Sequence, residues 1–111
     1  MRVYVPATLD RLAGFVESGQ VPPGDDRFLA AEETEEAEYD ALVEAADAAT
    51  ALLDGPGRRV VVVADVTDPD AAFPMSVVAS VHADTEAVDP AARELPDLGW
   101  YAVQEIPDLL G

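Results

Sequence analysis

The chain has 111 residues, half of them apolar, and 23 acidic residues against six arginines give a formal net charge of −17. A chain of this length forms one domain with a modest core, so we expect a single globular domain over residues 1–111. Without cysteine, neither a disulfide framework nor a thiolate metal site can form. Clustered cations are also missing, which argues against direct binding to DNA or RNA phosphates.

The start of the chain shows no basic segment followed by an apolar run, and no stretch reaches about 18 uninterrupted apolar residues. We therefore expect a cytoplasmic protein that does not enter a membrane. The Debye length at physiological salt is about 8 Å, so most of the charge repulsion is screened in the cell. A surface this acidic favours a partner with a basic surface.

Residues 2–6 are predicted to form the first strand, because apolar side chains alternate there with polar ones. Pro6 is expected to end it. A helix follows, for which Thr8 is a suitable N-cap and Gly19 a suitable stop. The apolar face of this helix is expected to comprise Leu9, Leu12, Ala13 and Val16.

Residues 27–31 are a candidate short strand, and the longest periodic segment comes after them. From Thr34, apolar side chains recur at helical spacing until the glycines and proline of residues 55–57 stop the helix. The apolar positions of this helix are Tyr39, Leu42, Ala46, Ala49 and Leu53. A second stripe of the same helix is acidic and consists of Glu36, Asp40, Glu44 and Asp47.

The apolar run over residues 60–64 is too short for a helix and predicts a central strand that is buried on both faces. Residues 75–82 are predicted to form the next strand. Its core face is expected to consist of Met75, Val77, Ala79 and Val81. Asp89 and Pro90 suit the start of a short helix. Residues 99–105 are predicted to return to strand, and a helical turn is expected to end the chain.

Helices interspersed with strands, one of them buried, indicate an α+β fold of the α/β sandwich kind. We expect a mixed β-sheet of about four to five strands that is covered by helices. A ferredoxin-like topology is one arrangement that this order of elements allows. The oligomeric state stays open between a monomer and a homodimer.

Four residues near the C-terminus combine aromatic and polar groups that a plain strand would not require: Trp100, Tyr101, Gln104 and Glu105. The two aromatic residues are adjacent, so in a strand they point to opposite faces, and one can be buried while the other is exposed. An exposed aromatic side chain beside polar groups is typical of a protein recognition site. Packing of the last strand is the plainer explanation of the same residues.

The acidic stripe of the long helix also has more than one interpretation. A solvated helix face accounts for Glu36, Asp40, Glu44 and Asp47 without any partner. The same charges would suit a basic protein surface, and they would also allow the helix to imitate a nucleic-acid backbone. Binding to a basic protein and imitation of a nucleic acid would both use the stripe as a binding surface.

Asp65, Asp68 and Asp70 follow the predicted central strand, and His82 is the single histidine. Carboxylates at strand ends commonly hold hard cations, and histidine serves in acid–base chemistry and metal ligation. These four residues are candidates for the site of a metal-dependent or acid–base enzyme. Aspartates beside threonine and proline are equally ordinary in turns. Glycine-rich phosphate loops are missing, so no nucleotide or other cofactor is predicted.

Three segments have distinctive sequences: residues 1–9 read MRVYVPATL, residues 59–66 read RVVVVADV, and residues 100–110 read WYAVQEIPDLL. With weaker matches at residues 36–42 and 81–84, the chain resembles an uncharacterised family of actinobacterial proteins, a domain of unknown function, whose members carry these motifs in the same order. The resemblance implies an actinobacterial origin and an intracellular setting. It brings no activity, cofactor or catalytic residue.

The leading hypothesis is a small non-enzymatic protein that binds or regulates a protein with a basic surface. It rests on the net charge, on the lack of a catalytic constellation and on the aromatic C-terminal segment. The acidic stripe and the C-terminal aromatic segment are the predicted binding surface. The alternatives are the metal-dependent or acid–base enzyme and the nucleic-acid mimic.

Overall fold

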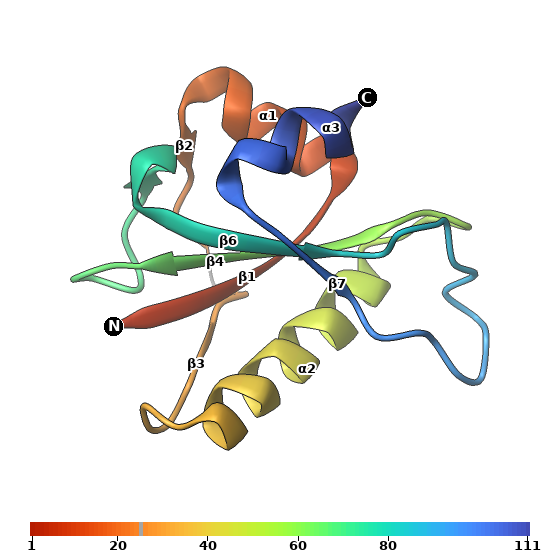
Figure 1. The fold of residues 1–111 in the computed structure, drawn as a ribbon, viewed down its shortest axis with the longest axis horizontal. Coiled ribbons are helices and arrows are strands. Elements are labelled where there is room, and N and C mark those ends of the chain that lie inside the picture. Colours follow the sequence, from red (N-terminus) through yellow and green to blue (C-terminus); the bar gives the residue numbers. More distant parts are fainter. Residues whose placement is uncertain (25) are drawn as a thin grey trace.

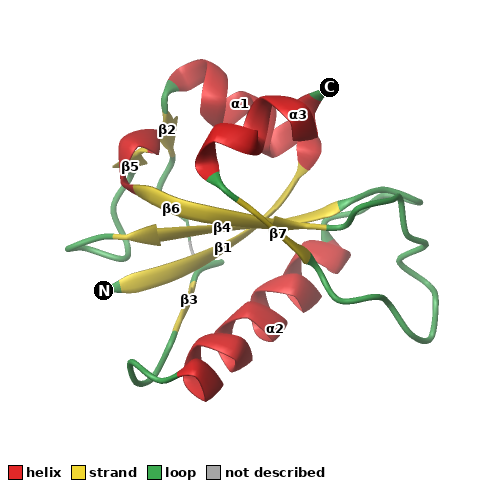
Figure 2. Cartoon of the chain, viewed as in Figure 1, coloured by secondary structure: helices red, strands yellow, loops and turns green. Residues whose placement is uncertain are grey.

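The computed structural model describes residues 1–24 and 26–111. In these residues a five-stranded sheet lies between helices, with α1 and α3 on one face and α2 on the other (Figures 1 and 2). The sheet consists, in spatial order, of β3 (Phe28–Leu29), β1 (Arg2–Thr8), β4 (Arg59–Asp65), β6 (Val78–Ala83) and β7 (Gly99–Tyr101). The helices are α1 (Leu9–Ser18), α2 (Glu35–Ala51) and α3 (Ile106–Leu110). The α+β fold and the strand number expected from the sequence are confirmed.

Every pairing between the described strands of this sheet is antiparallel, so the expectation of a mixed sheet was wrong. A ferredoxin-like fold packs its helices on one face of the sheet, and the opposite placement of α1 and α2 departs from that topology (Figure 2). Two short strands, β2 (Gln20–Val21) and β5 (Phe73–Pro74), pair with each other outside the main sheet.

Side chains alternate between the two faces of the sheet, and we name these the α1 face and the α2 face. The α1 face buries a large cluster that includes Val3, Val5, Ala7, Val60, Val62, Ala64 and Val81 of the sheet. Leu12, Phe73, Ile106 and Leu109 cover it. The α2 face buries a smaller cluster, in which Tyr4, Val61 and Val63 meet Ala41, Ala45 and Ala46 of α2. The strand predicted from the apolar run is therefore central and covered on both faces.

The start of the chain follows the prediction in its caps and departs from it in two details. Thr8 accepts a hydrogen bond from the Arg11 backbone N–H at 3.3 Å, and Gly19 ends α1 with a φ of 78°. Pro6 lies inside β1. Proline is tolerated at this position because β3 pairs only with Val3 and Tyr4, so one edge of β1 is open at Pro6. Of the predicted apolar face, Ala13 and Val16 are exposed, and Leu12 is the buried centre of the helix.

The long helix α2 begins where the periodic segment was predicted to start, and the Thr34 hydroxyl caps it by accepting a hydrogen bond from the Ala37 backbone N–H at 3.2 Å. Its buried face consists of Ala41, Ala45, Ala46 and Ala49. The prediction of Tyr39 as a core position was wrong, because this side chain is 56% exposed. Alanines allow the helix backbone to approach the sheet closely, and the bulky side chain turns outward.

The predicted strand over residues 75–82 begins later, because Met75–Val77 form a 3₁₀ turn before β6. The pairing of β6 with β4 then shifts between Val63 and Ala64, as in a β-bulge. The shift changes the alternation, so Val78 and Val81 both join the α1-face cluster while Ala79 is exposed. Of the predicted core face, Val81 belongs to this cluster and Met75 and Val77 pack against it, so the prediction was wrong only for Ala79.

Two predictions for the last quarter of the chain also need correction. Asp89 begins only a turn, in which its carboxylate accepts a hydrogen bond from the Ala91 backbone N–H at 2.9 Å. The last strand is shorter than expected, because Val103–Glu105 form a 3₁₀ turn that leads into α3. Among the described residues, no helix combines the length and the apolar character needed to cross a membrane.

Candidate interaction site

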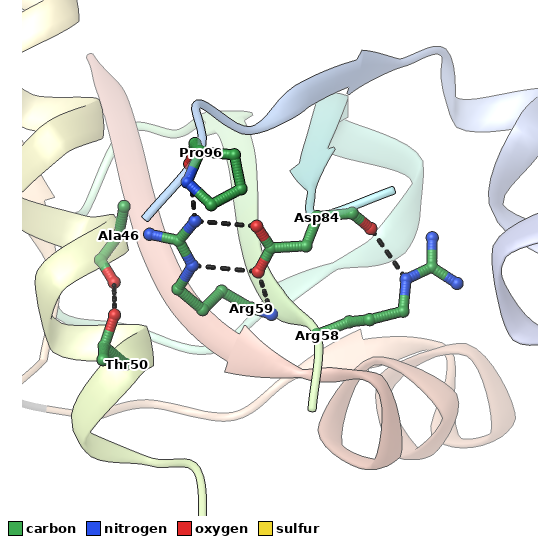
Figure 3. Close-up of polar contacts among 6 residues, drawn as sticks. All are labelled: Ala46, Thr50, Arg58, Arg59, Asp84 and Pro96. Atoms are coloured by element: carbon green, nitrogen blue, oxygen red, sulfur yellow. Dashed lines mark hydrogen bonds and ion pairs between the residues drawn. The ribbon is translucent and has the colours of Figure 1, made fainter. Parts of the chain in front are cut away.

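A buried ion pair joins the start of β4 to the end of β6. Antiparallel pairing of Val60 with Ala83 brings Arg59 and Asp84 together, although they are 25 positions apart. The Arg59 guanidinium donates two hydrogen bonds to the Asp84 carboxylate, from Nε at 2.9 Å and from Nη2 at 2.7 Å (Figure 3). The side chains are only 5% and 1% exposed. Two parallel hydrogen bonds fix the orientation of the guanidinium plane.

Further hydrogen bonds connect this pair to the segment between β6 and β7. Arg59 Nη2 donates to the Pro96 carbonyl at 2.7 Å, and the Arg59 backbone N–H donates to the Asp84 carboxylate at 2.8 Å. The neighbouring Arg58 donates to the Asp84 carbonyl at 2.7 Å. Residues 85–98 contain little helix or strand of their own. The hydrogen bond from Arg59 to Pro96 therefore helps to position this segment against the sheet.

A cavity of about 530 Å³ lies between α2 and residues 90–98, and we call it the α2 pocket. On the helix side it is lined by Tyr39, Leu42, Val43, Ala46, Asp47 and Thr50. On the other side the lining includes Arg93, Leu95, Asp97 and Leu98, and Arg59 also contributes. This volume lies in the range of pockets that bind small molecules.

The third nitrogen of the Arg59 guanidinium, Nη1, points toward α2, where Ala46 and Thr50 lie (Figure 3). Within residues 1–24 and 26–111 it donates no hydrogen bond. The Thr50 hydroxyl donates to the Ala46 carbonyl at 3.0 Å, so its oxygen retains acceptor capacity. The pocket thus combines apolar walls with a fixed cationic donor.

An exposed tryptophan lies on the same face of the sheet as this pocket. Trp100 pairs with His82 across β6 and β7, and His82 pairs with Val61 of the α2-face cluster, so all three belong to the α2 face. The Trp100 side chain is 62% exposed. Burial lowers the pKa of His82, since desolvation disfavours the imidazolium. Leu98, which lines the pocket, is two residues before Trp100.

The four C-terminal candidates are divided by the structure. Trp100 and Gln104 are exposed, whereas Tyr101 is half-buried and packs on the α1-face cluster. The Glu105 carboxylate accepts a hydrogen bond from the Ala102 backbone N–H at 3.0 Å and so caps the 3₁₀ turn. The sequence prediction that one aromatic residue is exposed and the other packs holds for this pair.

The four acids of the α2 stripe are all exposed and lie opposite the buried alanines: Glu36, Asp40, Glu44 and Asp47. None of them has an ion pair or side-chain hydrogen bond with another described residue. Asp47 also lines the α2 pocket. The stripe and the pocket therefore share one edge of the helix.

The residues of the predicted metal or acid–base site are held in separate arrangements. Asp65 accepts two hydrogen bonds from Arg2, both at 3.1 Å, and these hold the pKa of the carboxyl below its usual range. Asp68 caps a turn by accepting a hydrogen bond from the Asp70 backbone N–H at 2.9 Å. His82 lies on β6 opposite Val61. In the part of the chain that the structure describes, no three His, Asp or Glu side chains are grouped to hold a metal ion.

Arg59 and Asp84 were not among the predicted site residues. The signal was present, since Arg59 begins the RVVVVADV motif and Asp84 ends the weaker match at residues 81–84. Nothing in the sequence alone places these two positions side by side. A charged residue directly before an apolar run is a further indication, because it suggests that this position lies at the edge of the sheet.

Comparison with protein families identifies the chain. The model of a family described as "Family of unknown function (DUF6912)" matches residues 1–110. The chain belongs to this family. Since DUF6912 is a family of unknown function, membership transfers no activity to the residues of the α2 pocket. Searches of curated proteins and of solved structures gave no significant match. The actinobacterial origin implied by the motifs stays a prediction.

Proposed function

We propose that this DUF6912 protein is a non-enzymatic protein that binds a partner protein with a basic surface. The observation that carries the proposal is the α2 pocket, which Tyr39 and Asp47 line, together with the acidic stripe that includes Asp47 and the exposed Trp100 on the same face of the sheet. Trp100 and Tyr39 are the aromatic residues, and the stripe of α2 supplies the acids. Aromatic residues at the centre of a surface and charges at its rim are typical of protein interfaces.

Electrostatics support the same proposal. The net charge of −17 attracts a cationic surface at long range, and the stripe provides four negative charges along one helix edge. Complementary charges mainly accelerate association and select the partner, while buried apolar contacts contribute more of the affinity. We place this interaction in the cytoplasm, as expected from the sequence.

The test is a pull-down from an actinobacterial lysate at ~150 mM salt with a variant that neutralises the stripe. This variant carries Glu36→Gln, Asp40→Asn, Glu44→Gln and Asp47→Asn. A matched control neutralises four exposed acids away from α2: Asp10→Asn, Glu17→Gln, Asp70→Asn and Asp108→Asn. Both variants change the net charge by the same amount, so only the position of the charges differs.

We expect the stripe variant to lose a partner that the wild type and the control variant both retain. Trp100→Ala should lose the same partner, since an exposed interface tryptophan contributes to binding and little to the fold. Equal recovery of every partner by all four proteins would refute the proposed function.

A further inference from the structure

The α2 pocket contains a feature that a purely electrostatic surface does not require. Arg59 is buried at its base and is held in one orientation by Asp84 and by the Pro96 carbonyl. Its Nη1 nevertheless points toward α2, with no hydrogen bond to another described residue (Figure 3). A donor fixed in this way can donate a hydrogen bond to a ligand oxygen without reorganisation.

Local charges indicate which oxygen fits. The positive charge of Arg59 is already balanced by Asp84. The remaining charged residues of the lining are Asp47, Asp97 and Arg93, so two acids face one base. A carboxylate would add negative charge to a site whose remaining charge is already negative, whereas a neutral carbonyl oxygen would accept the hydrogen bond without that cost.

The walls indicate the rest of the ligand. Leu42, Val43, Leu95 and Leu98 offer apolar contacts at the sides of the cavity. The acids of the stripe continue outward from Asp47 along the helix. A segment with an apolar side chain, a neutral main-chain carbonyl and flanking basic residues therefore matches the pocket, its base and its rim at the same time.

We infer that the α2 pocket binds an apolar residue of a basic peptide segment, with Arg59 Nη1 donating a hydrogen bond to a main-chain carbonyl of that segment. This inference rests on the proposed function and names its recognition element. Arg59 selects a neutral amide, the pocket selects an apolar side chain, and the stripe selects the flanking positive charges. The exposed Trp100 extends the same surface beyond Leu98.

The probe is an acetylated and amidated pentapeptide with a central leucine between four lysines, titrated into the full chain by calorimetry at ~150 mM salt. A peptide with serine in place of leucine has the same charge and is the first control. We expect the leucine peptide to bind about tenfold more tightly, because only its side chain buries apolar surface in the pocket. A peptide with four glutamates should not bind measurably.

Val43→Trp is the matched change in the protein, because Val43 lines the pocket and is exposed on α2, so the larger side chain fills the cavity without entering the core. It should abolish the preference for leucine and keep the weaker charge-dependent binding. N-acetylleucinamide supplies the same carbonyl and side chain as a free small molecule. Its binding should be at least tenfold weaker than that of the leucine peptide, and equal affinity would overturn the assignment to a peptide.

The role of Arg59 has its own readout. The Nη1 protons of Arg59 should shift in ¹⁵N-resolved NMR spectra on addition of the leucine peptide, whereas those of Arg27, which already donate to the Pro69 and Ala71 carbonyls, should not. Unchanged Arg59 signals at saturation would overturn the carbonyl contact. Equal affinity for the leucine and serine peptides would overturn the pocket inference. If, in that case, the stripe variant still bound both peptides more weakly than the wild type does, the proposed function would stand.

Discussion

The two faces of the sheet are built on different principles. The α1 face is closed by branched and aromatic side chains from two helices and the β2–β5 ribbon, which bury the larger of the two clusters. The α2 face is covered by alanines over β1 and β4, while β6 and β7 carry His82 and Trp100 outside the helix contact. One face is therefore closed by packing, whereas the other leaves a cavity and exposed aromatic groups.

The largest expected effect comes from the buried ion pair. This pair is the polar element that positions one wall of the α2 pocket. Asp84→Ala should destabilise the protein by about 3–5 kcal/mol, since it leaves the Arg59 charge buried without its partner. Urea unfolding measures the loss. The control is Asp65→Ala, which removes the exposed pair with Arg2 and should cost only about 0–1 kcal/mol. Losses of similar size for both variants would contradict the assigned role of the buried pair.

The second prediction compares the packing of the two faces. Leu12→Ala removes a fully buried side chain from the α1 face and should cost about 2–5 kcal/mol. On the α2 face, Ala45→Leu adds volume where the helix contacts the sheet and should cost about 1–3 kcal/mol. Thermal or urea unfolding measures both. A neutral Ala45→Leu would show that the helix has space to move away from the sheet.

The third prediction concerns the adjacent aromatic residues of β7. Trp100→Ala should change the free energy of unfolding by less than about 0.5 kcal/mol, because the side chain is largely exposed. Tyr101→Ala should cost more, since Tyr101 packs on the α1-face cluster. Unfolding curves of the two variants decide this. Equal losses would contradict the assignment of the tryptophan to binding and the tyrosine to stability.

The smallest expected effect is the pH dependence that His82 contributes. Its folded-state pKa is lowered by burial, so below about pH 6.5 the unfolded chain takes up the proton before the folded one does. The His82 contribution to stability is therefore complete above this pH and decreases as pH falls toward the folded-state pKa. Comparison of wild type and His82→Gln by urea unfolding between pH 7.5 and pH 5 measures it. Parallel curves over the whole range would refute it.

Local patterns were sufficient for much of the fold. Thr8 caps the first helix and Gly19 ends it as predicted, the second long helix starts after Thr34 as predicted, and the apolar run became the central strand. The reason is that capping, glycine conformation and short-range periodicity depend on neighbours in the sequence. The exposure of the acidic stripe was also predictable, because it lies opposite the alanines on the same helix.

Other features depend on contacts between distant segments. Tyr39 was assigned to the core from its spacing, and it is exposed because the alanines, rather than the bulky residues, set the rotation of α2 on the sheet. The shift in β6 near Val78 came from its pairing with β4, which leaves no local pattern. The candidate enzyme residues were close in the sequence pattern, but Asp65 pairs with Arg2 and Asp68 with a backbone group.

Composition and local sequence patterns account for the acidity, the absence of thiol chemistry, the caps of the first helix and the buried central strand. The sheet order, the two unequal faces and the α2 pocket with Arg59 at its base depend on contacts between distant segments. The physical reason is that composition and caps are properties of neighbouring residues, whereas a buried ion pair exists only when antiparallel pairing brings its two strand ends together.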